Sequence, residues 1–288
     1  KAIEINPNNL DANNNLGEIF KELREYPKAI NYFGKVIKLE INDTKAISNL
    51  YDIFSVFYFA TMTEADHAVI KESLLHLFRK NNINHVSICK NAIATLPVPK
   101  NNEVQKILNS KYSILDNKTI QSLLKEELLL LVLKKTLIVD SSLEKILTKL
   151  REKILFLLND SNKNILNNYF DFITALSEQS LLNEYIHFQS KGEIENINKL
   201  KNKIENSEEI NEIEIALLGC YIPLKTSKII LNKLFKYKSK NILFNNLITT
   251  HIKEPLKEAE LRSSIKSLGN ISDTVSIKVK NQYEENPY

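Results

Sequence analysis

The feature of this sequence that most constrains its fold is a repeat with a period of 34 residues near the N-terminus. Identical residues recur at this spacing in four pairs: Ala12 with Ala46, Asn15 with Asn49, Leu16 with Leu50, and Phe20 with Phe54. The same offset extends backwards to three further pairs: Lys1 with Lys35, Ile3 with Ile37, and Ile5 with Leu39. A fixed period of this length indicates helical hairpins that stack and bury their apolar faces against one another. We therefore expect the chain to begin inside the second helix of a truncated repeat.

The stretch from residue 14 to residue 40, NNLGEIFKELREYPKAINYFGKVIKLE, resembles the tetratricopeptide repeat. The residues that carry the resemblance are Leu16, Gly17 and Phe20 in the first helix, and Ala29 and Phe33 in the second. The sequence departs from the family pattern at three positions: Asn13 replaces a common Trp, Ile41 replaces a closing proline, and Tyr51 replaces the small residue aligned with Gly17. The middle repeat therefore fits the family, and the third is degenerate, as expected at the end of an array.

Asn15 and Asn49 are the candidate peptide-binding residues. They occupy the same position in successive first helices, which line the concave face of tetratricopeptide arrays. An amide side chain donates and accepts hydrogen bonds at once, so a row of amides can bind the backbone of an extended peptide. The alternative is that both residues reflect the general abundance of Asn in this chain, because a row, or ladder, of only two amides does not distinguish the two explanations.

Helical periodicity continues after the repeats, and the fold class we expect is all-α, a short repeat array followed by an irregular helical domain. In the stretch from residue 141 to 158, Ser141 and Glu144 form a capping-box pattern. One buried stripe follows it, made of Leu143, Ile146, Leu147, Leu150 and Ile154. The same periodicity predicts helices over residues 118–135, 167–188 and 209–224. Turn-forming residues place the boundaries, which give repeats at 1–57, further helical hairpins at 58–100, a helical domain at 101–268 and a connector at 269–288.

The composition argues against several classes of function. The net charge is +4, and the basic residues are almost all lysine, with arginine only at Arg24, Arg79, Arg151 and Arg262, which disfavours a nucleic-acid partner. The longest apolar run, residues 128–133, is too short to cross a bilayer, so we expect a core helix and no membrane partner. The five glycines are widely separated and form no phosphate-binding loop. Two cysteines far apart indicate no disulfide framework, so a reducing cytoplasm is the expected location.

Residues that could carry chemistry have simpler explanations. His67, His76 and His85 do not share a helical face at metal-ligand spacing, so we expect no metal site. Cys89 lies four residues after His85, the spacing of a possible nucleophile pair, but it more simply packs as a small hydrophobic residue. Tyr169, Phe170 and Phe172 are best explained by core packing. We predict no catalytic, cofactor-binding or metal-binding residue in this chain.

Residues 160–288 carry a second resemblance. The segments FDFITALSEQSLLNEYIHF, IALLGCYIPL and HIKEPLKEAELRSSIKSL, followed by QYEENPY, resemble the helical middle of bacterial tetratricopeptide-repeat proteins fused to a class I S-adenosylmethionine-dependent methyltransferase. The most specific element is the run from Tyr283 to Tyr288. The resemblance implies a catalytic domain after this run, which would bind S-adenosylmethionine, and no cofactor in the chain itself. Glu284 and Glu285 would then belong to the junction and not to an active site.

Two functions from different classes follow. The first is a non-catalytic region of a methyltransferase that binds a protein or peptide partner and positions the substrate. The second is a stand-alone tetratricopeptide adaptor with no enzymatic activity.

Overall fold

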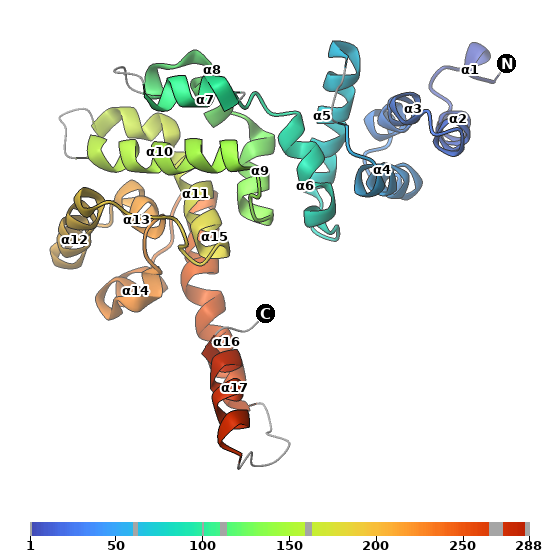
Figure 1. Cartoon of the computed structure of the whole chain (residues 1–288). Coiled ribbons are helices and arrows are strands. Elements are labelled where there is room, and N and C mark those ends of the chain that lie inside the picture. Colours follow the sequence, from blue (N-terminus) through green and yellow to red (C-terminus); the bar gives the residue numbers. More distant parts are fainter. Residues whose placement is uncertain are drawn as a thin grey trace.

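The computed structural model describes residues 2–59, 63–99, 101–109, 114–158, 163–264 and 273–285. These residues form helices and connecting turns with no strand among them, which confirms the all-α fold. The molecule is extended rather than spherical (Figure 1), with the N-terminal helices at one end and the last helices forming a separate projection. The expected boundary between residues 268 and 269 lies outside the described residues, as do residues 286–288 of the Tyr283–Tyr288 run. The domain boundaries remain predictions.

The N-terminal repeats are built from four helices: α1 (Ala2–Ile5), α2 (Leu10–Glu22), α3 (Tyr26–Leu39) and α4 (Thr44–Val56). Helix α1 takes the place expected for the second helix of a preceding unit, and α2 and α3 form one complete hairpin. A Cβ atom added at Gly17 would stand 2.5 Å from the ring of Phe33. Glycine is therefore required at this position so that α2 and α3 can approach closely, as the repeat pattern predicts.

Asn13, which departs from the repeat pattern, is fully buried in α2. Its Nδ2 donates to the backbone oxygens of Pro7 at 3.0 Å and Asn9 at 2.7 Å. Asn9 in turn caps α2, because its side chain accepts from the backbone N–H of Ala12 at 2.8 Å. The amide therefore holds the turn before the helix by hydrogen bonds, where the family's larger aromatic residue would fill space.

The helices after the repeats extend the packed array. They are α5 (Glu64–Arg79), α6 (His85–Ala94), α7 (Asn101–Leu108), η1 (Ile114–Asp116), α8 (Lys118–Leu124), α9 (Glu127–Lys135) and α10 (Ser141–Leu157). Helix α5 packs against both α3 and α9 and so joins the repeats to the later helices. Asn91 of α6 fixes the end of α4, since its Nδ2 donates to the backbone oxygens of Phe54 at 2.9 Å and Phe57 at 2.8 Å.

Two local predictions in this region are wrong in detail. The single helix expected over residues 118–135 is broken between α8 and α9, where Glu126 has an extended backbone. In one continuous helix Ile120 and Leu129 would lie on opposite faces, yet both are fully buried, and the break allows each to face a core. The capping box at Ser141 is also absent. Asp140 caps α10 instead, because its Oδ1 accepts from the backbone N–H of Leu143 at 2.8 Å.

The predicted stripe of α10 is confirmed, since all five of its apolar residues are buried. The remaining helices are η2 (Lys163–Tyr169), α11 (Phe170–Leu182), α12 (Lys191–Asn206), α13 (Glu212–Gly219), η3 (Leu224–Thr226), α14 (Lys228–Phe235), α15 (Ile242–Ile248), the π-helical turn η4 (Thr249–Lys253), α16 (Glu254–Ser264) and α17 (Thr274–Glu285). Helix α11 is shorter than expected, because the chain leaves it at Leu182. It is nearly surrounded by α9, α13 and α15, which explains why ten of its residues are buried.

Candidate functional site

The hollow between α2 and α4 is the best candidate for a functional site. It has a volume of about 580 Å³, which falls within the ~300–1,000 Å³ range of ligand pockets. Its lining comes from the C-terminal halves of these two first helices and from the turn into α3, and we call it the repeat groove. The lining residues are Glu18, Lys21, Glu22, Arg24, Tyr26, Asn49, Asp52, Ile53, Ser55 and Val56.

One lysine bridges the two walls of the repeat groove. The Nζ of Lys21 in α2 donates to Asn49 Oδ1 at 2.8 Å and to Asp52 Oδ2 at 2.8 Å, both in α4. The amide of Asn49 also donates from its Nδ2 to the backbone oxygen of Lys45 at 3.1 Å. The Asn49 side chain is therefore held in a fixed orientation at the wall of the groove.

The structure places the two predicted ladder residues differently. Asn49 lines the repeat groove, whereas Asn15 is an exposed residue of α2 outside the groove lining. Asn14 links the repeats instead, since its Nδ2 lies 3.4 Å from each carboxylate oxygen of Asp43, the cap of α4. The asparagine ladder stays a prediction, and Lys21 is the residue that the repeat pattern alone did not single out.

The repeat groove has a polar part and an apolar part. Glu18, Lys21, Glu22 and Asp52 provide the polar part, and Tyr26, Ile53 and Val56 the apolar part. Val56 is 78% exposed and thus available to a ligand. This combination suits a peptide, which offers both apolar side chains and hydrogen-bonding groups.

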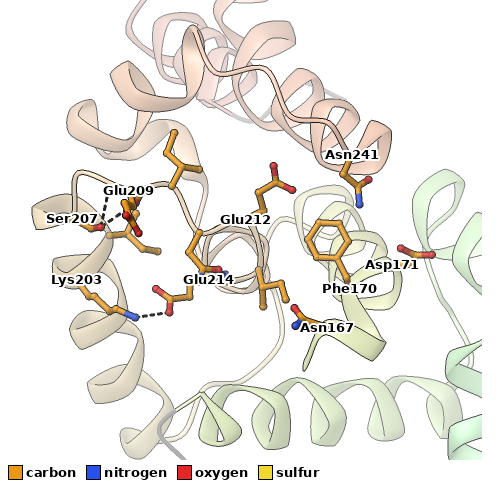
Figure 2. A pocket seen from close by; sticks show the side chains of 13 residues that line it. Asn167, Phe170, Asp171, Lys203, Ser207, Glu209, Glu212, Glu214 and Asn241 are labelled. Atoms are coloured by element: carbon orange, nitrogen blue, oxygen red, sulfur yellow. Dashed lines mark hydrogen bonds and ion pairs between the residues drawn. The ribbon is translucent and has the colours of Figure 1, made fainter. Parts of the chain in front are cut away.

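A second, larger hollow of about 710 Å³ lies among α11, α12, α13 and the start of α15 (Figure 2). Four carboxylates line it: Asp171, Glu209, Glu212 and Glu214. Figure 2 shows Lys203 of α12 reaching Glu214, with which it forms an ion pair. Tyr237 Oη donates to Glu212 Oε1 at 2.9 Å, so two of the four carboxylates already have partners within the protein.

The carboxylates of this acidic hollow have a structural explanation. Asp171 stands in the first turn of α11, and Glu212 and Glu214 stand in the first turn of α13. A carboxylate at this end of a helix is stabilised by the positive end of the helix dipole. These acids thus stabilise the helices that carry them, and their presence needs no ligand.

The residues that could carry chemistry have structural roles in the core. Cys89 is buried, its Sγ lies 3.0 Å from Thr136 Oγ1, and burial raises the pKa of its thiol. His85 is buried against the ring of Phe78, and burial lowers the pKa of its imidazole. Phe170 and Phe172 are buried in α11, as expected for core residues. Within the described ranges, no group of three or more His, Cys, Asp or Glu side chains is arranged to hold a metal ion.

The helices of the described part of the chain are all too short or too polar to cross a membrane. Residues 128–133 belong to a core helix, as expected from the sequence. The buried side chains of this stretch in α9 are Leu128, Leu129, Val132 and Leu133.

Comparison with known families finds one match. A family model described as Tetratricopeptide repeat matches residues 1–31, which cover α1, α2 and the start of α3. No curated protein and no solved structure matches the chain. The match supports the repeat prediction for the N-terminal segment, and a tetratricopeptide repeat suggests a role in protein interaction.

Proposed function

We propose that the repeat groove binds an extended segment of a partner protein. On this proposal the chain is a protein-interaction region, and the helices after the repeats hold the bound partner in a defined place. The observation that carries it is the position of the groove between the first helices of two successive repeats, where α2 belongs to the segment that matches the tetratricopeptide family.

The chemistry of the groove supports a peptide as the ligand. The exposed side chain of Val56 and the half-buried ring of Tyr26 adjoin charged groups on α2 and α4. The bridge from Lys21 to Asn49 and Asp52 holds the two walls together before any ligand arrives. A groove with preformed walls loses less conformational freedom on binding, which favours affinity.

A selection from a library of random twelve-residue peptides displayed on phage tests this function, with the whole 288-residue chain as bait. The control bait is Val56→Trp, which places a bulky ring in the groove at a position with ample exposure. We expect enriched peptides that bind the wild-type chain and lose binding to the control. Enriched peptides that bind both baits equally would contradict the proposal.

We further propose that this interaction region is part of a tetratricopeptide-containing S-adenosylmethionine-dependent methyltransferase, in which it positions the substrate. The support is the resemblance carried by residues 160–288, of which α17 (Thr274–Glu285) would be the connecting helix. All described side chains of α17 are exposed, as a connecting helix requires. The alternative is the stand-alone adaptor.

The DNA after the codon for Tyr288 distinguishes these two possibilities. The methyltransferase proposal expects an open reading frame that continues into a strand followed by an acidic-Gly-x-Gly loop. A stop codon directly after Tyr288 would favour the adaptor. Calorimetry with S-adenosylmethionine provides a second test, because on this proposal the 288-residue chain binds none, and tight binding would contradict it.

A further inference from the structure

We infer that the segment bound in the repeat groove is basic, with a lysine or arginine side chain that lies over Glu18 and Glu22 and an apolar neighbour that contacts Val56. This inference rests on the proposed function and specifies the chemistry of the partner.

The first argument is an unfavourable pair of charges on α2. Glu18 and Glu22 are four residues apart on one helix, so their carboxylates are neighbours on its surface. Like charges at this spacing destabilise a helix. Neither carboxylate has an ion-pair or hydrogen-bond partner among the described residues. Both line the repeat groove.

The second argument is the position of Glu22 in its helix. Glu22 is the last residue of α2, where the negative end of the helix dipole disfavours a carboxylate. The acidic hollow among α11, α12 and α13 shows the opposite arrangement, since three of its acids stand in first turns and stabilise their own helices. Glu22 therefore works against the stability of the helix that carries it, whereas those three acids of the hollow do not. Such a departure from local stability is expected where residues serve binding.

The basic groups of the groove do not cancel this charge. Lys21 lies between Glu18 and Glu22 in sequence, but its ammonium group is held by Asp52 and Asn49 across the groove. Lys21 and Asp52 thus neutralise each other, which leaves Glu18 and Glu22 against Arg24 alone. The excess is negative on the wall formed by α2, and this wall would attract a cationic side chain.

The apolar part of the groove sets where the apolar residue of the bound segment would lie. Val56 is 78% exposed at the end of α4, and the ring of Tyr26 at the start of α3 lies tilted against that of Phe57, with the ring centroids 4.8 Å apart. This surface faces the same hollow as the carboxylates. A segment with a basic residue beside an apolar one therefore matches both parts of the groove.

The same phage selection tests the inference when its enriched peptides are sorted by charge. We expect the peptides that bind wild-type chain but not Val56→Trp to be enriched in lysine and arginine and depleted in aspartate and glutamate. Groove-dependent peptides that are neutral or acidic would overturn the inference and leave the proposed function intact. A selection without any groove-dependent peptide would overturn both.

A titration of the most enriched peptide, followed by fluorescence anisotropy, gives the second test. The variant is Glu18→Gln with Glu22→Gln, and we expect it to bind the peptide roughly tenfold more weakly because two charge contacts are lost. The matched control is Glu195→Gln with Glu258→Gln, which removes two exposed carboxylates from α12 and α16, outside the repeats. We expect this control to bind as the wild-type chain does, and equal weakening in both variants would overturn the inference.

The melting temperatures of the two variants separate binding from folding. Removing Glu18 and Glu22 relieves repulsion, so we expect that variant to melt at the wild-type temperature or higher. Weaker binding together with a lower melting temperature would contradict the inference, because it would assign these carboxylates a structural role.

Discussion

Lys21 of α2 and Asp52 of α4 lie 2.8 Å apart, from Nζ to Oδ2, and form the ion pair that crosses the repeat groove. The Lys21 side chain is 29% exposed and that of Asp52 is 51% exposed, so water screens their attraction. The pair is thus a modest contributor to stability that links α2 to α4 across the groove.

Replacing Lys21 by Met tests this contribution while retaining most of the apolar length of the side chain. We expect the free energy of unfolding to fall by about 0.2–1 kcal/mol, which is the range for exposed ion pairs. Urea denaturation measures it, and Lys45→Met, at an exposed position of the same helix as Asp52, is the control. If Lys21→Met and Asp52→Asn act additively in a double-mutant cycle, the two residues are not coupled and the bridge is without consequence.

Gly17 and Gly34 form a matched pair of tests in one helical hairpin. A Cβ at Gly17 would stand 2.5 Å from the Phe33 ring, whereas one at Gly34 would meet its nearest neighbour, Val69, at 3.5 Å. We expect Gly17→Ala to destabilise the chain by about 1–3 kcal/mol through overpacking. We expect Gly34→Ala to stabilise it by about 0.5–1 kcal/mol, because alanine favours a helix interior. Thermal denaturation compares the two, and changes of the same sign would disprove the close approach of α2 and α3.

Glu178 of α11 is a buried carboxyl whose charged form is disfavoured. It is 8% exposed, its Oε1 has no hydrogen-bond partner among the described residues, and burial raises its pKa to about 6. The pKa of Glu178 in the unfolded chain is its ordinary value of 4.5. The free energy of unfolding therefore falls as the pH rises from 4.5 through about 6, by about 2 kcal/mol in all. We expect Glu178→Gln to raise the free energy of unfolding by about 1–2 kcal/mol at pH ~8 and to change it little at pH ~4. Equal effects at both pH values would rule out the titration of Glu178 as the cause.

His251 of η4 has the opposite dependence on pH. It is 1% exposed, its Nε2 lies 3.3 Å from Ser177 Oγ, and burial lowers its pKa to about 4. As the pH falls below about 6.5, the unfolded chain takes up a proton that the folded chain does not, so stability is lost until about pH 4. The expected loss is about 3 kcal/mol.

The variant His251→Gln tests this account through unfolding free energies measured at several pH values. We expect a shallower fall in stability between pH ~6.5 and pH ~4 than in the wild-type chain. His67→Gln, at a half-buried position of α5, is the matched control. An unchanged acid slope in His251→Gln would show that other groups control the loss of stability.

The sequence predicted the parts of the fold that depend on local pattern. The 34-residue period led to α2, α3 and α4, and the apolar stripe of α10 is buried as expected. The break between α8 and α9 has no Gly or Pro to mark it. It lets Ile120 and Leu129, which one continuous helix would place on opposite faces, both be buried, and tertiary packing of this kind overrides helix propensity.

The candidate site was predicted only in part, for a related reason. The repeat register indicated which helices line a groove and placed Asn49 there. It did not indicate that Lys21 would reach across to Asn49 and Asp52, because such a contact depends on the distance between α2 and α4. Nor did it separate the acids of α2 from those of α13, since only the helix ends show which carboxylates the dipole stabilises.

Hydrogen–deuterium exchange of the whole chain with the most enriched phage-selected peptide tests the central claim most directly. Our account predicts slower exchange of backbone amides in α2 and α4, where the repeat groove lies, with no change in α11 and α13. Slower exchange confined to α11 and α13, around the acidic hollow, would contradict the assignment of the repeat groove as the binding site.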